Sequence, residues 1–177
     1  MVVVFIVVEE RKMNAMDDSL QRIRSVANYQ FGLGVGEKLF PNAVEIQFSK
    51  ATGRIRYVNL NGERLATLRP TDGLLSLSIT AAQRLVECAA FVRCLVMVRS
   101  DVARFVAEGG DVFAVHVVKV DEKVHAKDEV IVVDEARGVV AVGRAVLSGC
   151  EMLAFKTGVA VKVRHGCAEN TSGATKG

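Results

Sequence analysis

The chain has 177 residues, of which 50% are hydrophobic and 24% are charged, so it can form one ordinary domain or two small ones with a real core. Its formal net charge is only +3, which permits nucleic-acid binding without arguing for it. Its four cysteines form no C-x-x-C pair, and no histidine stands at a metal-ligand interval from them. We therefore expect reduced thiols, no metal site and no cofactor.

The first segment, Met1 to Val8, is an apolar run that is far too short to cross a bilayer. No small-residue cleavage site follows it and no positive charge precedes it, so it does not fit a secretory signal. We expect residues 1–16 to be an edge strand or the product of a start codon assigned too early, because Met13 and Met16 follow closely. With no other candidate membrane segment, we expect a soluble, cytoplasmic protein.

From Asp17 to Gln30 the sequence predicts an amphipathic helix, because apolar residues recur at the spacing of one helical face. A glycine-rich stretch then breaks the pattern, with one short helical turn expected near Glu37 to Phe40. The spacing from Gly32 to Glu37 is G-x-G-x-G after a helix, whereas a dinucleotide site needs G-x-G-x-x-G after a strand. We interpret it as a tight turn between helices, with a backbone nest for one phosphate as the alternative.

A β-meander is expected next, because apolar and polar residues alternate and Asn61-Gly62 is a strong hairpin signal. The expected elements, in chain order, are strands at 44–48, 54–60, 63–70 and 72–79 and a helix at 80–90. The arginines on or beside this meander are Arg54, Arg56, Arg64 and Arg69. Residues 17–92 are thus expected to form an α+β domain, with its boundary near Ala90 to Arg93.

Residues 93–166 are expected to form a mainly β, nearly closed barrel, because several short strands occur with little helix. The expected elements, in chain order, are a strand at 94–98, a helix at 101–110, a long strand at 111–120, strands at 129–134 and 138–148, a helical turn at 151–155 and a strand at 158–165. Paired glycines, Gly109 and Gly110, are a usual helix-stop signal. Residues 167–177 are polar and rich in small residues, so we expect a disordered tail.

The last predicted strand carries a candidate binding surface. Side chains alternate along a strand, so Lys162 and Arg164 share one face of it. Lys156 lies just before this strand, and Arg144 lies in the neighbouring one. An ordinary solvated barrel face explains the pattern equally well, and a stripe that contacts phosphates is the functional alternative.

Platforms for stacking bases are expected to be scarce, because aromatic residues make up only 6% of the chain. Phe105, Phe113 and Phe155 all occupy positions that fit the apolar core. Recognition of single-stranded bases by stacking is therefore disfavoured. Recognition of a helical stem through phosphates and 2′-hydroxyls fits the composition better.

No catalytic constellation emerges from the sequence. The spacing of His116, His125 and His165 matches no metalloprotease or catalytic-triad pattern. Five pairs of acidic residues are adjacent in the sequence, and most of these pairs lie at predicted turns, where solvated charge explains them. We therefore expect no catalytic residue and no enzymatic activity.

The second half, roughly Cys94 to His165, resembles the PUA domain, named after pseudouridine synthases and archaeosine transglycosylases. The segments that carry this resemblance are VAEGGDVFAVHV, KDEVIVVDEARGVVAVGRAVLSG, EMLAFKTG and VAVKVRHG. One departure is Ala126-Lys127-Asp128, where the family commonly has Pro-Gly-Asp.

The first half resembles the domain that precedes PUA in archaeal tRNA-guanine transglycosylases. The segments that carry this resemblance are RIRSVANYQFGLGVGEKLFP and SKATGRIRYVNLNGERLATLRPTDGLLSLSI. Together the two resemblances imply an α+β N-terminal domain followed by a mainly β PUA-type pseudo-barrel with short helices. They also imply the RNA-docking portion of those enzymes without their catalytic barrel.

In that family the groove between the first PUA helix and the last strand grips the acceptor-stem end of tRNA. The residues that this implies as RNA contacts are Arg104, Gly109, Gly110, Lys162, Arg164 and His165. The cationic pattern adds Arg144 and Lys156. Gly109 and Gly110 would let a phosphate approach the backbone closely.

We expect a non-catalytic protein that binds structured RNA, with tRNA as the favoured ligand and a separate tRNA-modifying enzyme as a further partner. A protein-interaction module that docks on an RNA-modification or translation complex is the alternative. A third hypothesis is an enzyme or small-molecule binder with its site beside the glycine-rich turn.

Overall fold

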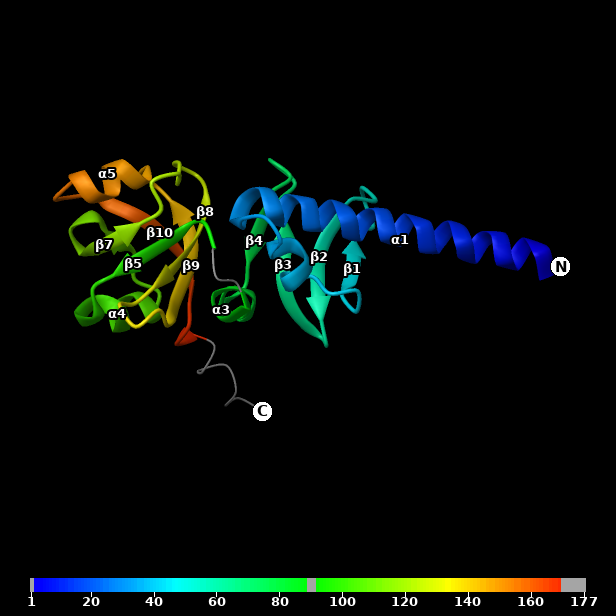
Figure 1. Cartoon of the computed structure of the whole chain (residues 1–177), viewed down its shortest axis with the longest axis horizontal. Helices are drawn as coiled ribbons and strands as arrows, with labels where there is room; N and C mark the ends of the chain where they lie inside the picture. Colours follow the sequence, from blue (N-terminus) through cyan, green and yellow to red (C-terminus); the bar gives the residue numbers. More distant parts are fainter. Residues whose placement is uncertain (1, 89–91, 170–177) are drawn as a thin grey trace.

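In the computed structural model, which describes residues 2–88 and 92–169, the chain folds around two sheets that lie side by side (Figure 1). The first unit has four antiparallel strands in the order β1-β2-β3-β4, and the second has six in the order β6-β10-β9-β8-β5-β7. The expected α+β unit followed by a mainly β, nearly closed barrel with short helices is confirmed. The expected boundary near Ala90 to Arg93 falls partly on residues 89–91, outside the described residues.

The first unit contains α1 (Val2–Phe31), α2 (Val35–Leu39), β1 (Glu45–Phe48), β2 (Ile55–Leu60), β3 (Glu63–Leu68), β4 (Leu75–Leu77) and α3 (Ile79–Cys88). Asn61 and Gly62 both take positive φ, as the hairpin between β2 and β3 requires. Ile23, Leu39 and Leu85, one from each helix, are fully buried in the core. The predicted order and type of these elements are therefore confirmed, although α1 begins well before Asp17 and β4 is shorter than the strand expected at 72–79.

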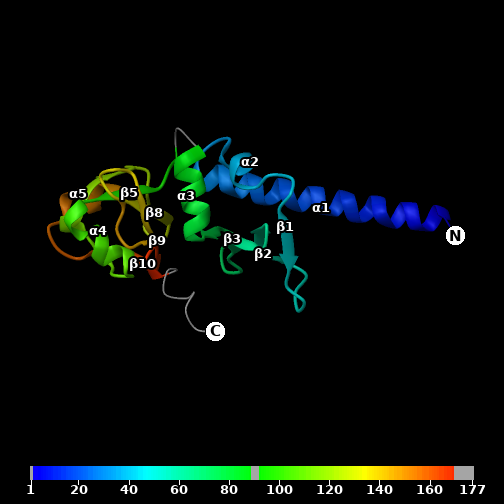
Figure 2. The ribbon, with the colours of Figure 1, turned by 90° about the horizontal axis from the view of Figure 1, so that it is seen from below.

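The strand expected within residues 1–16 is wrong, because α1 begins at Val2. Figures 1 and 2 both show the first half of α1 projecting beyond β1, away from either sheet. A strand needs a neighbouring edge for its backbone hydrogen bonds, whereas a helix satisfies them internally and elongates readily once started. Within the described residues, no helix is both long and apolar enough to cross a membrane.

The second unit contains β5 (Leu95–Val98), α4 (Ser100–Ala107), β6 (Val112–Phe113), the 3₁₀ turn η1 (Ala114–His116), β7 (Val117–Val120), β8 (Glu129–Val133), β9 (Val139–Ala145), α5 (Gly149–Ala154) and β10 (Val159–Gly166). The long strand expected at 111–120 is wrong, because η1 divides it. Its first part pairs with β10 and its last part with β5, which lie towards opposite edges of the sheet. This one segment therefore carries the chain around the nearly closed barrel.

The two units pack directly against each other. One hydrophobic core runs through both, from Leu20 in α1 to Val161 in β10. Figure 2 shows α3 standing between the two sheets, and α3 contacts both β3 and β9. The tail expected at 167–177 lies mostly outside the described residues, which end at Glu169.

Candidate nucleic-acid interface

Cations predicted on the last strands line a groove at the boundary between the two units. β10 pairs antiparallel with β9, and this register sets Lys162 directly opposite Arg144. Lys127 from the turn before β8 and Ser76 from β4 extend the lining of an open cavity of about 600 Å³. We call this cavity the junction groove. Its other lining residues are Ala126, Ala145, Val146, Val163 and Arg164.

Two of these cations, Lys127 and Arg144, have exposed side chains, and neither lies within 4.0 Å of a carboxylate in the described part of the chain. The charge of Arg144 nevertheless acts across the junction on Asp72 of the first unit. Burial raises the pKa of Asp72, but the Leu74 backbone N–H and the charges of Arg69 and Arg144 outweigh it and leave the pKa below its usual value. The contribution of Arg144 is the smallest of these, so its effect on the first unit is slight.

Lys162 projects into the junction groove with an acidic partner. Its Nζ lies 2.7 Å from Oδ2 of Asp111, and Oδ1 of Asp111 accepts a bond of 2.9 Å from the Val163 backbone N–H. The Lys162 side chain is still 71% exposed. An ion pair whose ammonium group is so exposed is weak, although Asp111 itself is half-buried, so a phosphate can compete for Lys162.

Arg164 lines the groove, but its guanidinium is turned towards the first unit. It donates two hydrogen bonds to the carboxylate of Glu129, and its Nη2 also donates to the Leu77 carbonyl oxygen at 2.8 Å. Glu129 is buried, with 1% of its surface exposed. The structure thus commits most of the donor capacity of Arg164 to the junction, a role that the sequence pattern did not indicate. Its contact with RNA stays a prediction.

The end of α4 converges on the end of β10. A Cβ at Gly166 would overlap the Ala107 carbonyl oxygen, so only glycine permits this approach. Gly109 takes a φ of 99°, which favours glycine, and a Cβ at Gly110 would overlap the Phe105 ring. The fold itself therefore favours glycine at both positions. The RNA contact that we predicted for them stays a prediction.

The remaining predicted site residues lie away from the junction groove. Arg104 is highly exposed on α4, and its Nε donates a bond of 3.0 Å to Glu108. His165 is exposed at the end of β10, with its Nδ1 3.9 Å from Oε2 of Glu169. Lys156 is exposed in the loop between α5 and β10 and does not line the groove. The structure therefore divides the predicted contacts between the groove, the α4 end and this loop.

The three phenylalanines expected in the core are in fact partly exposed. Phe105 is 57% exposed, Phe113 42% and Phe155 46%. On α4 it is Val106 that faces the core, and on the two-residue edge strand β6 it is Val112. Phe155 follows the last turn of α5. The expectation that these three rings lie in the core is therefore wrong, and the case for scarce stacking platforms now depends on the low aromatic content of the chain alone.

The arginines of the first sheet form a further basic area. Arg56 and Arg64 flank the Tyr57 ring, with their Cζ atoms 4.8 and 3.8 Å from its centroid. Arg69 differs from them, because it is buried and pairs with Asp72 at 3.0 Å. Exposed cations therefore occur on both units, and the junction groove lies where the two units meet.

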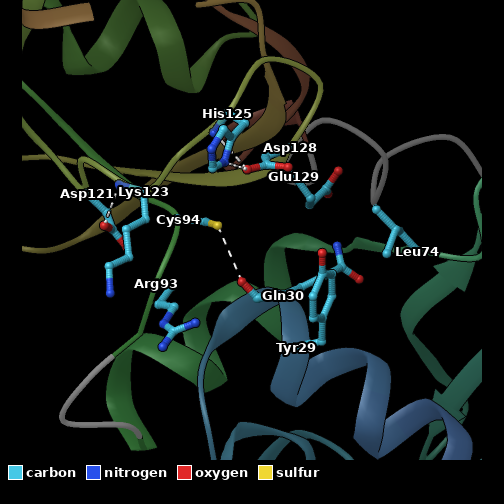
Figure 3. A pocket seen from close by; sticks show the side chains of 10 residues that line it. All are labelled: Tyr29, Gln30, Leu74, Arg93, Cys94, Asp121, Lys123, His125, Asp128 and Glu129. Atoms are coloured by element: carbon cyan, nitrogen blue, oxygen red, sulfur yellow. Dashed lines mark hydrogen bonds and ion pairs between the residues drawn. The ribbon is translucent and has the colours of Figure 1, made fainter. Parts of the chain in front are cut away.

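A polar crevice of about 320 Å³ also lies between the units (Figure 3). Its acidic groups stabilise turns, since Asp128 accepts from the His125 backbone N–H and Asp121 from that of Lys123. Burial raises the pKa of the Cys94 thiol to about 12, with the charges of Asp128 and Asp121 adding to the rise. Cys94 is therefore protonated at neutral pH and is no nucleophile.

The glycine-rich turn is a helix–helix connection, as expected. A Cβ at Gly36 would overlap the Arg24 backbone, so this glycine lets α2 pack on α1. The N–H of Val35 donates to the Gly32 carbonyl oxygen, and that of Gly36 donates to Asn28 Oδ1 at 2.7 Å. These donors are therefore already used, which weakens the alternative of a phosphate nest. In the described part of the chain, no cluster of three or more His, Cys, Asp or Glu residues could hold a metal ion.

Comparison with protein families finds two matches in the same order as the two units. The patch-forming domain C2 of tRNA-guanine transglycosylase matches residues 21–91, and the PUA domain matches residues 95–167. The tRNA-guanine(15) transglycosylase of Methanobrevibacter smithii is 40% identical over 149 residues, which are 84% of this chain and 23% of that protein. Its counterpart in Pyrococcus furiosus is 42% identical over 153 residues, which are 86% and 26%. The chain thus spans about a quarter of the length of these relatives.

Solved structures show the same arrangement. A hypothetical protein from Pyrococcus horikoshii OT3 has a TM-score of 0.70 at 25% identity, over 90% of this chain and 96% of that one. A conserved PUA domain protein from Thermoplasma acidophilum has a TM-score of 0.62 at 18% identity, over 85% and 89%, and shows the shared fold. This chain is therefore a PUA-domain protein of archaeal type, in which the PUA domain follows a C2-type domain like that of the tRNA-guanine transglycosylases.

Proposed function

We propose that this protein binds structured RNA, with tRNA as its ligand, and catalyses no reaction itself. The observation that carries the proposal is the junction groove, where Lys127, Arg144 and Lys162 present positive charge beside the edge of the first sheet. The chain also matches the C2 and PUA domains of enzymes named for tRNA. A groove shared by two domains suits a folded RNA, whose phosphates follow a curved track.

The net charge of the whole chain is small. The affinity of the junction groove for RNA must therefore come from the cations that are concentrated within it. A Lys or Arg that neutralises a phosphate releases condensed counterions, and the binding constant then falls steeply with salt. Three accessible cations within one groove are enough for a clear salt dependence. The exposed Phe105 and Phe113 additionally offer apolar ring faces near the end of α4.

The proposal that the protein catalyses no reaction is supported by the polar groups of the described residues, which already have structural roles. The turn carboxylates and Cys94 are occupied or protonated, as described above. The match to the transglycosylases covers about a quarter of their length. We infer that the protein presents tRNA to a separate modifying enzyme.

A protein-interaction module remains the second candidate, favoured by one apolar surface. Leu33 is 95% exposed between two glycines of positive φ, beside a cavity of about 740 Å³ that Leu95 and Met97 also line. Such a cavity suits an apolar side chain of a partner protein. Co-purification of a partner that survives nuclease treatment, and is lost in Leu33→Ala, would favour this candidate over RNA binding.

Measurement of tRNA affinity at several salt concentrations tests the proposed function. The double variant Lys127→Ala/Arg144→Ala is expected to weaken binding about tenfold or more and to reduce the slope of log K against log[salt] by roughly 1–2. The control Lys119→Ala/Lys123→Ala removes the same charge from exposed positions outside the groove, and it should change affinity by less than about threefold. Equal loss in both variants, or no binding by the wild type, would refute the proposal.

A further inference from the structure

The outer edge of β4 is completed by side chains. β4 is the last strand of the first sheet, and its free backbone groups belong to Leu75 and Leu77. The side-chain amide of Gln30 both accepts from the Leu75 N–H at 2.7 Å and donates to its carbonyl oxygen at 3.2 Å. It thereby replaces the strand that would otherwise pair at this position.

At Leu77 the second unit supplies both a hydrogen-bond acceptor and a hydrogen-bond donor. Glu129 Oε1 accepts from the Leu77 N–H at 2.9 Å, and Arg164 Nη2 donates to the Leu77 carbonyl oxygen at 2.8 Å. Arg164 and Glu129 also bind each other. One carboxylate–guanidinium pair from β8 and β10 therefore docks the second unit on the sheet edge of the first.

Glu129 is the centre of this arrangement. Its carboxylate is completely buried, with Arg164 bound to it and Nη1 of Arg69 3.9 Å from its Oε2. A buried carboxylate is tolerated only when such partners remain in place, so each partner depends on the others. Ser76, the residue between Leu75 and Leu77, lines the junction groove. The position of β4 against β10 therefore sets the shape of that groove.

We propose that Glu129 is a positioning residue for RNA binding, which holds the two domains in the one orientation that forms the junction groove. This inference rests on the proposed RNA-binding function. For the loss of Glu129 it predicts a change in tRNA affinity that is opposite in sign to the change expected from charge alone. Removing a negative charge beside a site for a polyanion should strengthen binding if only charge mattered. Removing Glu129 should weaken it, because the groove loses its fixed shape and Arg69 and Arg164 lose their shared partner.

The test compares full-length Glu129→Gln with wild type by tRNA affinity and by hydrogen exchange of the Leu77 amide. We expect tRNA binding at least fivefold weaker and Leu77 exchange at least tenfold faster. The control Glu122→Gln removes the same charge from an exposed position and should bind tRNA within twofold of wild type, or slightly tighter. Equal or tighter binding by Glu129→Gln, or weaker binding with unchanged Leu77 exchange, would overturn the inference.

If Glu129→Gln fails to fold, the variant Arg164→Lys tests whether the pair of Glu129 and Arg164 positions the two domains. It keeps the positive charge but loses the planar fork that binds the carboxylate and the Leu77 carbonyl together. Weaker tRNA binding with faster Leu77 exchange supports positioning, whereas unchanged exchange refutes it. If wild type binds no tRNA at all, the proposed function fails, and Leu77 exchange still shows separately whether Glu129 joins the domains.

Discussion

At Gly143 the backbones of β9 and β10 come too close for any side chain. A Cβ at this position would overlap the Lys162 carbonyl oxygen, which is backbone and can move only with its strand. Gly143→Ala should therefore lower the free energy of unfolding by about 1–3 kcal/mol. Urea denaturation measures this, with the exposed neighbour Arg144→Ala as the control, expected within about 0.5 kcal/mol of wild type. Equal stability of Gly143→Ala and wild type would show that the two strands separate easily.

The identities of Lys162 and Arg164 do not indicate which acidic residues they bind. The alternation of side chains predicts that Lys162 and Arg164 share a strand face, and in the structure both line the junction groove. It gives Asp111 to the first and Glu129 to the second, over separations of 51 and 35 residues. No local pattern connects residues that far apart, because the order of the strands decides which acid lies beside which base.

At the scale of elements, α5 shows how much a local sequence can determine. Ser148 and Glu151 form a capping box, in which the Ser148 N–H and hydroxyl donate to Glu151 Oε2 and the Ser148 oxygen accepts from the Glu151 N–H. The residues of this motif are only three positions apart in the sequence, and a short helical turn was expected at 151–155. In the structure the helix begins two residues earlier and spans Gly149–Ala154, with Phe155 just beyond its end.

Ser148→Ala should lower the free energy of unfolding by about 1 kcal/mol at neutral pH, because the Glu151 N–H loses its side-chain acceptor and the Glu151 carboxylate loses the hydroxyl donor. The Ser148 backbone N–H and then its hydroxyl lower the pKa of Glu151. The share that comes from the hydroxyl-to-carboxylate bond is therefore present above the ordinary glutamate pKa and is lost as pH falls through the lowered one. Denaturation at a series of pH values should show the stability difference between wild type and Ser148→Ala becoming smaller in acid, while the part due to the Glu151 N–H remains. A difference independent of pH would contradict this account.

The divided strand at 111–120 shows what local pattern leaves undecided. Its apolar residues favour strand throughout, yet η1 interrupts it so that β6 and β7 can join β10 and β5. The same holds for the first turns of α1, where an edge strand was one of the two expectations, beside a misassigned start codon. In both segments the outcome depends on whether a sheet edge lies nearby, and that is a property of the assembled fold.

At the scale of the whole molecule, the continuous core and the buried Glu129 make the two domains one body. We expect wild type to unfold in a single cooperative transition. Both tyrosines, Tyr29 and Tyr57, belong to the first domain, so tyrosine fluorescence reports on that domain and circular dichroism on both. The two signals should coincide during urea denaturation. Separate midpoints in wild type would show that the domains are independent and the junction groove is not fixed.

By itself, the sequence determined the order and type of most elements, the glycine turn between α1 and α2, and the resemblance to a C2-type domain followed by PUA. These features depend on residues close together in the chain, where periodicity and turn chemistry act. The tertiary structure alone decided the exposure of Phe105, the partners of Arg164 and the junction groove itself. Each of these depends on which strands become neighbours, because burial and ion pairing are set by contacts between segments that lie far apart in the chain.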